Sequence, residues 1–405
     1  MLKGIKVDEA REILASIPVC APETETVPLF KAQGRVLAES VEAKMNVPPF
    51  DRSPYDGYAV RGEDTACATR EAPVVLRIIE ELPAGTAPEK TVTAGTAAKI
   101  LTGAPVPPGA NAIIKYEDTE FTESEVRIFS PIKPDTDIIY AGEDVKAGTV
   151  LVERGKLVTP AVAGSAAGQG YAGLKVYKKP RVCVMSTGSE LLEPGDEYRP
   201  AKIYNSNVYT IGAYLERMGA ECISLGCVPD DEEMIASKIS EALETCDMVV
   251  TTGGASVGDY DYALRAVRRA GAEPLFWKVS MKPGGSLVAS HKNGKPIIGL
   301  SGNPGAAIIA LLQVCAPLVR RLCGLKNTEP EALELKLHGD YRKKSPKQRF
   351  IRGRLLIENG EAFFVVNEGQ GNGVVSSFID SDLLGEIPAG GSPLNAGDKI
   401  KAYRI

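Results

Sequence analysis

The sequence predicts a multidomain protein of the α/β plus β class, and three observations carry this prediction. First, the chain has 405 residues, more than one hydrophobic core usually serves, since a domain mostly holds about 100 to 200 residues. Second, residues 180–326 alternate between short β-branched apolar runs and helical segments, which is typical of a doubly wound α/β domain. Third, short strand-like runs in residues 27–146 and 327–405 predict a mostly β domain and a C-terminal domain resembling a β-barrel. Residues 1–26 and 147–179 are expected to form a small helical linking domain.

The first half of the α/β domain follows from its apolar runs. Residues 181–187 (RVCVMST), 221–228 (ECISLGCV) and 247–254 (DMVVTTGG) are nearly continuous and β-branched, as in parallel strands that are buried on both faces. Residues 205–220 and 230–246 lie between these runs and have a helical pattern. The second of these segments opens with acidic residues, which favour a helix N-terminus.

The second half of the domain is expected to contain a hairpin and a long helix. Residues 286–301 (SLVASHKNGKPIIGLS) predict two strands that are joined by a turn at 293–294, Asn-Gly. Residues 303–324 then predict a long apolar helix that is kinked at Pro317 and ended by Gly324.

Composition and charge exclude several classes of protein. Hydrophobic residues make up 44% of the chain and charged residues 24%, as in ordinary globular proteins, and we expect no stretch of about 18 apolar residues that could span a membrane. The N-terminal segment carries acidic residues where a signal peptide needs an apolar run, which favours a cytoplasmic protein. The net charge is −5 and the basic residues are dispersed, which argues against a nucleic-acid partner.

The cysteines and histidines suggest neither a metal site nor a nucleophile. The eight cysteines include no C-x-x-C pair, and most are expected to be buried reduced thiols. The two histidines, His291 and His338, have no matching partner in their stretches, which argues against a histidine triad or a zinc site. Catalysis therefore has to use carboxylates, lysines, hydroxyls and the backbone.

A glycine-rich turn at residues 249–267, VVTTGGASVGDYDYALRAV, predicts a ligand site. Gly253 and Gly254 let backbone N–H groups approach a ligand, and the helix start that follows favours negative charge, so the ligand is expected to be an anion. Asp259 and Asp261 fit beside an anion only if a metal cation lies between them. The alternatives are an ordinary tight turn and an aspartate at 259 that caps the helix.

Five stretches of the chain share polar residues in loops that glycine or proline fixes. They are PPFDRSPYDGYAVR (48–61), ILTGAPVPPGANAII (100–114), STGSELLEPG (186–195), TTGGASVGDYDY (251–262), and MKPGGSLV with GLSGNPGAA (281–288 and 299–307). In this order they make the chain similar to the molybdopterin molybdenumtransferase family, whose relatives include the gephyrin E domain. The resemblance covers nearly the whole chain, and its blocks are specific in combination rather than singly.

The resemblance implies a reaction, a cofactor and an assembly. In this family molybdate is inserted into the dithiolene of adenylylated molybdopterin, AMP is released and molybdenum cofactor is formed, with Mg²⁺ assisting. The α/β domain is then the molybdopterin-binding domain. The resemblance further implies a homodimer, in which the β domain of one subunit covers the crevice of the other, and a molybdopterin adenylyltransferase as a partner that supplies the substrate.

Roles of individual residues follow from the resemblance and from their places at strand ends. The expected catalytic residues are Asp56, Glu190, Asp261 and Lys282, and the expected Mg²⁺ ligands are Asp261 and Glu190. The expected substrate-binding residues are Thr102, Asp144, Ser186, Thr187, Gly188, Gly253, Gly254, Ser256, Lys278, Pro283, Gly284, Ser301, Asn303, Pro304 and Ser376. Arg349 and Arg352 are further candidates for contacts to an oxyanion or a phosphate.

Several candidates also have a simpler structural interpretation. Glu190 would stabilise the first turn of a helix, and Asp144 would serve a turn beside glycines. Asp230 is expected to cap the helix that follows it. Lys278 and Lys282 would be solvated surface lysines.

The chain departs from the common family pattern at Ser301, where many relatives carry proline. A serine there loosens the loop or adds a hydroxyl donor near the oxyanion. Tungstate is therefore a second candidate substrate beside molybdate.

Three other functions compete with this hypothesis. A molybdopterin adenylyltransferase shares the GG-SVG block, but such proteins are usually short single-domain chains. A scaffold that anchors receptor peptides, as the gephyrin E domain does, would be expected to carry an appended linker or a second large domain. A nicotinamide dehydrogenase needs G-x-G-x-x-G after its first strand, and the sequence has none there.

Overall fold

The computed structural model describes residues 1–253 and 260–405, and of residues 260 and 261 it describes the backbone alone. The described chain forms two compact units. The first unit holds residues 1–39, 154–160 and 173–405, and the second holds residues 40–153 and 161–172.

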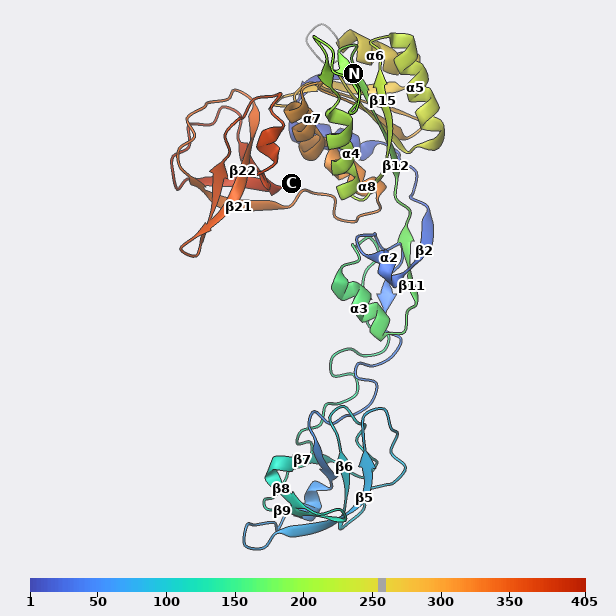
Figure 1. The fold of residues 1–405 in the computed structure, drawn as a ribbon, viewed down its shortest axis with the longest axis vertical. Helices are drawn as coiled ribbons and strands as arrows, with labels where there is room; N and C mark the ends of the chain where they lie inside the picture. Colours follow the sequence, from blue (N-terminus) through green and yellow to red (C-terminus); the bar gives the residue numbers. More distant parts are fainter. Residues whose placement is uncertain (254–259) are drawn as a thin grey trace. The chain divides into compact units, whose positions relative to one another are not determined.

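A seven-stranded mixed sheet forms the centre of the first unit (Figure 1). From edge to edge its strands are β1 (Leu2–Ile5), β17 (Glu273–Val279), β19 (Leu287–Lys292), β20 (Lys295–Leu300), β16 (Met248–Thr252), β12 (Arg181–Thr187) and β15 (Glu221–Val228). Strands β15, β12, β16 and β20 are parallel, so their carboxyl ends lie along one edge. The turn between β19 and β20 has φ values of 52° at Asn293 and 79° at Gly294, which confirms the predicted hairpin.

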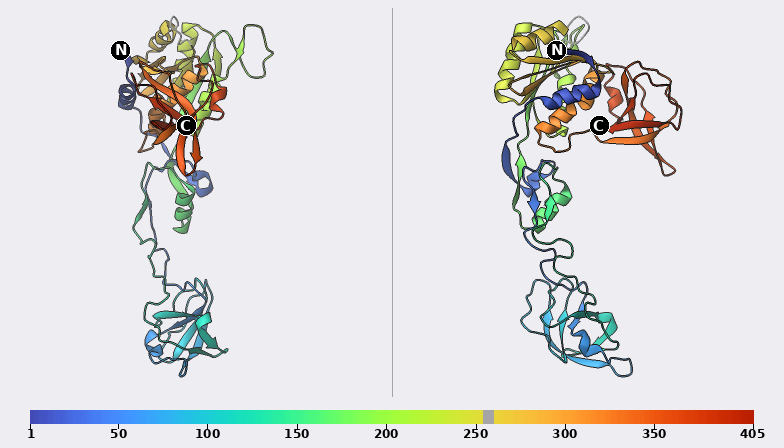
Figure 2. Two further views of the ribbon diagram at one scale, coloured as in Figure 1. Left: turned by 90° about the vertical axis from the view of Figure 1, so that its left-hand side faces the viewer. Right: turned by 180° about the vertical axis from the view of Figure 1, so that it is seen from behind.

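Helices cover both faces of this sheet, which confirms the doubly wound arrangement. They are α1 (Val7–Ser16), α4 (Asn207–Arg217), α5 (Glu232–Thr245), α6 (Tyr260–Arg269), α7 (Pro304–Ala310) and α8 (Ala316–Leu322). Helices α1, α4, α7 and α8 share one apolar core with the sheet, in which Leu14, Leu215 and Ile308 are buried. Helices α5 and α6 lie on the other side of the sheet (Figure 2). They share a second apolar core with it, which includes Ile239 and Val267. The central strands are therefore buried on both faces, as their continuous apolar runs predict.

The N-terminal strand and helix are part of the α/β domain, whereas the sequence predicts that residues 1–26 form a small domain with residues 147–179. Strand β1 pairs in parallel with β17, with Leu2 opposite Phe276 and Ile5 opposite Val279. Helix α1 buries Val7 and Leu14 in the core. A four-residue strand leaves too short a pattern for its pairing to be read from sequence.

The long apolar helix is interrupted before the predicted position. A π-helical segment, Leu311–Cys315, joins α7 to α8, and Pro317 lies in the first turn of α8, where its missing N–H is tolerated. The prediction of a kink at Pro317 is therefore wrong by a few residues, while Gly324 ends the helix with a φ of +86°, as predicted. The expectation that no apolar stretch is long enough to span a membrane is also wrong, because Pro304–Leu322 has the length and, with a mean hydropathy of 1.5, the composition of such a stretch. However, 89% of it is buried inside the protein, as in a core helix.

The C-terminal part of the first unit is a closed five-stranded barrel. Its strands are β22 (Gln348–Glu358), β23 (Glu361–Val366), β21 (Ala332–His338), β25 (Lys399–Arg404) and β24 (Leu383–Ile387), and pairing of β22 with β24 closes the ring. The two-residue strand β18 (Met281–Lys282) from the α/β domain adds to β22 at one side. The barrel confirms the C-terminal fold that the alternating pattern predicts.

A six-stranded half-barrel forms most of the second unit, which confirms the expected β domain. Its strands in order are β7 (Ala112–Lys115), β4 (Gly57–Val60), β6 (Thr96–Ile100), β5 (Val74–Leu82), β9 (Glu125–Ile128) and β8 (Thr119–Phe121). Tyr58, Leu76 and Val126 are buried on one face of this sheet, and Leu82 and Ile113 on the other.

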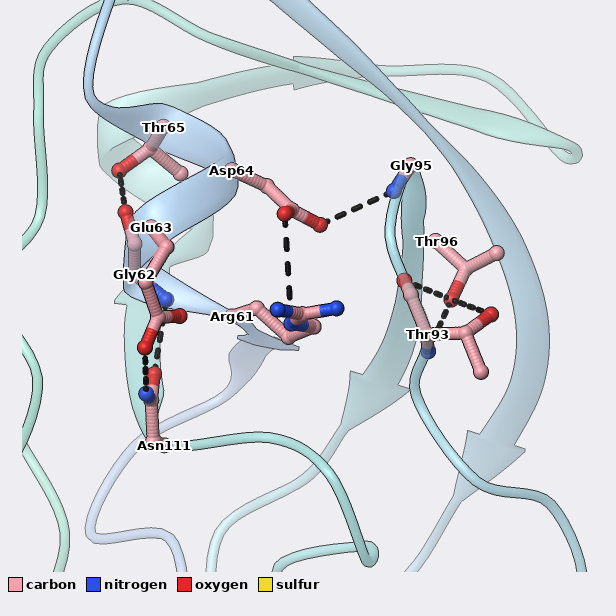
Figure 3. Close-up of polar contacts among 9 residues, drawn as sticks. All are labelled: Arg61, Gly62, Glu63, Asp64, Thr65, Thr93, Gly95, Thr96 and Asn111. Carbon is pink, nitrogen blue, oxygen red and sulfur yellow. Dashed lines mark hydrogen bonds and ion pairs between the residues drawn. The ribbon is translucent and has the colours of Figure 1, made fainter.

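A polar network fastens one end of this half-barrel (Figure 3). Asp64, on a 3-10 turn after β4, accepts a hydrogen bond from the Gly95 N–H at 2.9 Å. Asn111 accepts from the Gly62 N–H at 2.7 Å and donates to Glu63 at 2.9 Å. Each of these side chains therefore has a partner from another loop, which fixes the loops that connect the strands.

Candidate functional site

A cavity of about 700 Å³ opens at the carboxyl edge of the parallel strands, where open α/β sheets bind ligands. Seven of the expected site residues line it: Thr187, Gly188, Glu190, Gly253, Ser301, Asn303 and Pro304. The other lining residues are Leu191, Ile203, Tyr204, Ser206, Asn207, Asp230, Thr252, Tyr262, Gly302, Gly373 and Val375. The ends of β12, β16 and β20 therefore meet at one site, as their polar tails predict.

Glycine is required where these strand ends converge. A Cβ added at Gly253 would lie 2.1 Å from the Thr187 carbonyl oxygen, and Gly253 has a φ of +104°, which disfavours other residues. A Cβ added at Gly302 would lie 3.3 Å from the Gly253 Cα. The small residues let three chain segments approach, and they leave room for a ligand above them.

Two carboxylates lie in the cavity wall, Glu190 and Asp230. The chain after Gly188 forms a turn and the short strand β13 (Leu191–Leu192), so the interpretation of Glu190 as a residue of a helical first turn is wrong. The prediction that Asp230 caps α5 is also wrong. Asp231 is the cap and accepts from the Met234 N–H at 2.8 Å, whereas Asp230 accepts from the Ser189 N–H at 3.2 Å.

A buried hydrogen-bond network supports the cavity from behind. Ser186 donates to the Asn205 Oδ1 atom at 2.8 Å and lies 2.8 Å from the Thr252 hydroxyl. Asn205 donates in turn to Glu193 at 3.1 Å, and the Cys227 thiol donates to the same carboxylate at 3.0 Å. Burial acts to raise the pKa of Glu193, but hydrogen bonds, from Cys227 above all, hold that pKa below its ordinary value. The network joins the end of β12 to the segment between β13 and β14 (Ile203–Tyr204), which projects from the α/β domain (Figure 2, left).

The loop between β20 and α7 closes another side of the cavity. The Asn303 N–H donates to the Ser301 hydroxyl oxygen at 3.2 Å, which leaves the hydroxyl proton of Ser301 available. Asn207 donates to the Gly302 carbonyl at 2.9 Å. Pro304 is the first residue of α7, where its fixed φ suits a helix start.

The described cavity wall includes none of Lys278, Lys282, Pro283 and Gly284. Lys282 is exposed and pairs with Arg349 in the register of β18 and β22. The Lys278 ammonium lies 4.7 Å from the centre of the Trp277 ring. A Cβ added at Gly284 would lie 2.8 Å from a carbonyl oxygen of α7, so the Lys-Pro-Gly loop packs on that helix.

The barrel contributes one loop to the cavity, and Arg352 holds that loop. The Arg352 side chain is fully buried and donates to the carbonyls of Val374 at 2.9 Å and Gly371 at 3.0 Å. Its guanidinium is therefore engaged with the backbone, and burial lowers its pKa. This arrangement brings Gly373 and Val375 into the wall, and the exposed Ser376 follows directly.

The second unit brings Asp56 and Thr102 together, although 46 residues separate them. The backbone N–H and the hydroxyl of Thr102 both donate to the same oxygen of Asp56 at 2.7 Å. The backbone bond first and the hydroxyl bond second hold the pKa of Asp56 below its ordinary value. Asp144 is exposed elsewhere in this unit, in a turn that follows Gly142, and its N–H donates to the Val47 carbonyl at 3.0 Å.

Part of the glycine-rich turn lies outside the described residues. Gly254, Ser256 and Asp259 are among the residues that the structure does not describe. Helix α6 begins at Tyr260, so the backbone of Asp261 is in its first turn. Tyr262, one residue further, lines the cavity.

Comparison with known proteins gives a consistent set of relatives. Residues 5–170 match the MoeA N-terminal region (domains I and II), residues 183–321 a probable molybdopterin binding domain, and residues 334–405 the MoeA C-terminal region (domain IV). A molybdopterin molybdenumtransferase of Bacillus subtilis (strain 168) is 36% identical over 389 residues, which are 95% of this chain and 90% of the relative. The enzyme of the same name from Staphylococcus aureus (strain Mu50) is 35% identical over 93% of this chain and 90% of its own.

The chain belongs to the molybdopterin molybdenumtransferase family. The crystal structure of the molybdopterin biosynthesis MoeA protein from Pyrococcus horikoshii OT3 agrees with this placement. It has a TM-score of 0.85 and 30% identity, and the match covers 99% of this chain and 100% of that one. The family suggested by the sequence motifs is thereby confirmed.

Sequence reasoning missed several polar and aromatic residues of the cavity. The pattern of residues 205–220 predicts only a helix, whereas Asn207 lines the cavity and Asn205 supports it from behind. Tyr204 and Tyr262 line the cavity as well. A signal existed for the asparagines, because polar residues with hydrogen-bonding side chains follow a strand in IYNSN. The sequence predicts Asp230 as the helix cap in place of Asp231, since two adjacent aspartates before a helix look alike in sequence.

The carboxylates of the cavity fit a Mg²⁺ ion that keeps most of its waters. Magnesium is usually bound by one or two carboxylates together with water and substrate phosphates. Glu190 and Asp230 provide two carboxylates in one wall. No cluster of three or more His, Cys, Asp or Glu side chains suited to a metal occurs in the described part of the chain, which does not include the side chains of Asp259 and Asp261.

Proposed function

We propose that the protein inserts molybdate into adenylylated molybdopterin, releases AMP and forms molybdenum cofactor. The observation that carries this proposal is the cavity at the carboxyl edge of the sheet, with its glycine-bounded strand ends and two carboxylates, in a chain of this family. A phosphate-bearing ligand fits such a site, because backbone N–H groups and hydroxyls donate hydrogen bonds to its oxygens. The proposed setting is the cytoplasm, with an adenylyltransferase as the source of the substrate.

The proposed division of labour follows from the side chains. Thr187, Ser301 and Asn303 donate hydrogen bonds to phosphate or molybdate oxygens, and no nucleophilic side chain is needed. Glu190 and Asp230, together with the family's aspartate at Asp261, would hold Mg²⁺. When bound, this ion would neutralise charge on the phosphoanhydride that is cleaved.

Lys282 and the Asp56–Thr102 pair are proposed to serve the same reaction. Lys282 is exposed, and its ammonium group is carried on a long flexible side chain. We infer that this ammonium binds the oxyanion. Asp56 and Thr102 are held as a pair by two hydrogen bonds of 2.7 Å. We infer that they act in a homodimer, the assembly that the family resemblance implies.

The test is release of AMP from adenylylated molybdopterin, with molybdate, with tungstate and without an oxyanion, each in Mg²⁺ and in EDTA. Release that depends on both the oxyanion and Mg²⁺ supports the proposal. A comparable rate with tungstate would show that the hydroxyl of Ser301 is compatible with either oxyanion. Release at the same rate without an oxyanion would reject the proposal, and formation of ATP from the substrate on addition of pyrophosphate would favour an adenylyltransferase.

A further inference from the structure

A second cavity, of about 570 Å³, lies on the half-barrel of the second unit. Three adjacent strands contribute side chains in one row: in the pairing of β4, β6 and β5, Tyr58 lies opposite Lys99 and Lys99 opposite Glu81. Lys99 and Glu81 form an ion pair at 3.2 Å. Phe121 on β8 forms part of the rim.

The Tyr58 hydroxyl in this cavity wall is buried without a partner. Tyr58 is 0% exposed, and its hydroxyl oxygen has no hydrogen bond to any described residue. The hydroxyl of Tyr116, whose ring centre is 5.3 Å from that of Tyr58, is in the same condition. A buried hydroxyl without a partner is unfavourable, whereas Asp64 and Asn111 in the same half-barrel each have hydrogen-bond partners (Figure 3).

Both phenols are neutral and face a negative charge. Burial first, and the charge of Glu81 among the further causes, raise the pKa of Tyr58 and raise that of Tyr116 to about 12. Tyr58 and Glu81 both line the cavity, and the ring of Tyr116 packs against that of Tyr58. The Tyr58 hydroxyl can accept a hydrogen bond from a ligand as well as donate one.

The cavity wall carries more negative than positive charge. It contains the carboxylates of Glu80, Glu81 and Glu123 and a single ammonium, that of Lys99. Glu80 accepts from two backbone N–H groups, and Glu81 is paired with Lys99. Glu123 forms no ion pair with any described residue. The Phe121 ring beside it is 52% exposed and offers an aromatic surface.

We propose that this cavity binds an organic cation, an ammonium or guanidinium group carried on an apolar stem. The cation would be neutralised by Glu123, donate to the unpartnered Tyr58 hydroxyl, and lay its stem on the Phe121 ring, since aromatic faces attract cations and apolar stems alike. An anion is disfavoured by three carboxylates, and a purely apolar ligand would leave the hydroxyls unpaired. The source is either a free amine or an Arg or Lys side chain of a polypeptide.

The test is calorimetric titration of the full chain with butylguanidinium and butylammonium, with butyrate and butanol as controls of equal length. Tyr58→Phe removes only the unpartnered hydroxyl and Glu123→Gln only the charge. Glu120→Gln makes the same charge change on β8 at a residue outside the cavity wall. We expect binding of the cations alone, weakened about tenfold or more in the first two variants and unchanged in the third.

Folding is checked separately by thermal unfolding. Tyr58→Phe should leave the free protein at least as stable, because it removes a polar group that makes no bond. Absence of cation binding by the unaltered protein, or equal loss in Glu120→Gln and Glu123→Gln, would overturn the proposal. Comparison of putrescine with the blocked peptide acetyl-Gly-Arg-Gly-amide then separates a free amine from a polypeptide side chain as the natural source, because the natural class should bind more tightly.

Discussion

The cavity of the α/β domain and the Asp56–Thr102 pair of the β domain hold their polar groups in different ways. In the first, Ser186, Asn205 and Thr252 are almost fully buried and bonded to one another. In the second, Asp56 and Thr102 are exposed, and their hydrogen bonds lie at the surface. Buried networks couple function to stability, because a broken bond leaves a buried group unpaired. Exposed pairs can be altered with little effect on folding.

The largest effect is expected at Gly253, where backbone and side chain would both conflict with the fold. Gly253→Ala should destabilise the protein by about 3 kcal/mol or more, from a left-handed φ and from overpacking, and should abolish AMP release. Its φ is +104°, and the new Cβ would lie 2.1 Å from the Thr187 oxygen.

Gly195→Ala is the matched control for this change. Gly195 has nearly the same φ, +101°, but no described atom lies within 4 Å of its added Cβ. Urea unfolding should therefore show a loss near 1 kcal/mol, from the backbone strain alone. Equal losses in the two variants would mean that convergence of the strand ends does not require glycine.

Asn205→Ala is expected to have the next largest effect. It removes the partner of Ser186 and one donor to Glu193, so unfolding should be easier by about 2 kcal/mol. The segment after β13 should also be less ordered, which raises KM for the pterin substrate more than it lowers kcat. A loss of stability with unchanged KM would limit Asn205 to a structural role.

Asp230 and Asp231 allow a sharp test of the metal assignment. Asp230→Asn should raise the Mg²⁺ concentration for half-maximal AMP release by about tenfold, because a neutral amide is a weaker ligand for a hard cation. Asp231→Asn should change it little, since asparagine caps a helix as well as aspartate does. The reverse order of effects would contradict the assignment of Asp230 as a Mg²⁺ ligand.

The smallest effect on folding is expected at the exposed pair. Thr102→Val removes the hydroxyl bond and keeps the backbone bond, so the pKa of Asp56 should rise part of the way to its ordinary value. A carboxyl group whose pKa is lower in the folded state stabilises that state at every pH above the pKa of the unfolded chain. This contribution is lost as the pH falls through the pKa of the folded state. The variant should therefore lose a small part of this contribution at neutral pH and unfold like the parent only at a pH below the folded pKa, and NMR titration of the Asp56 carboxyl carbon should report the rise. An unchanged pKa would show that the hydroxyl contributes nothing.

The sequence predicted best what local patterns determine. The turn at Asn293–Gly294, the buried strands and the barrel alternation each follow from a few adjacent residues. The pairing of β1 with β17 and the bonds of Arg352 to the loop at 371–374 depend on contacts hundreds or tens of residues apart, which no local pattern encodes.

The candidate site shows the same division. The motifs at the strand ends predict that Thr187, Gly188 and Ser301 lie at one site, because the carboxyl ends of parallel strands lie along the same edge of a sheet. The structure places all three in one cavity wall. The distinction between Asp230 and Asp231 depends on which of two neighbouring side chains points to Ser189 and which to Met234. That choice is made by backbone geometry around α5 rather than by residue type.

The most direct test of the account is the stoichiometry of a single turnover. Limiting adenylylated molybdopterin is mixed with excess protein, Mg²⁺ and molybdate, and the AMP released and the pterin-bound molybdenum are both quantified. The account predicts equal amounts of the two products, and neither of them when the oxyanion is left out. AMP released without molybdenum bound to the pterin, or tight binding of the substrate without release, would contradict it.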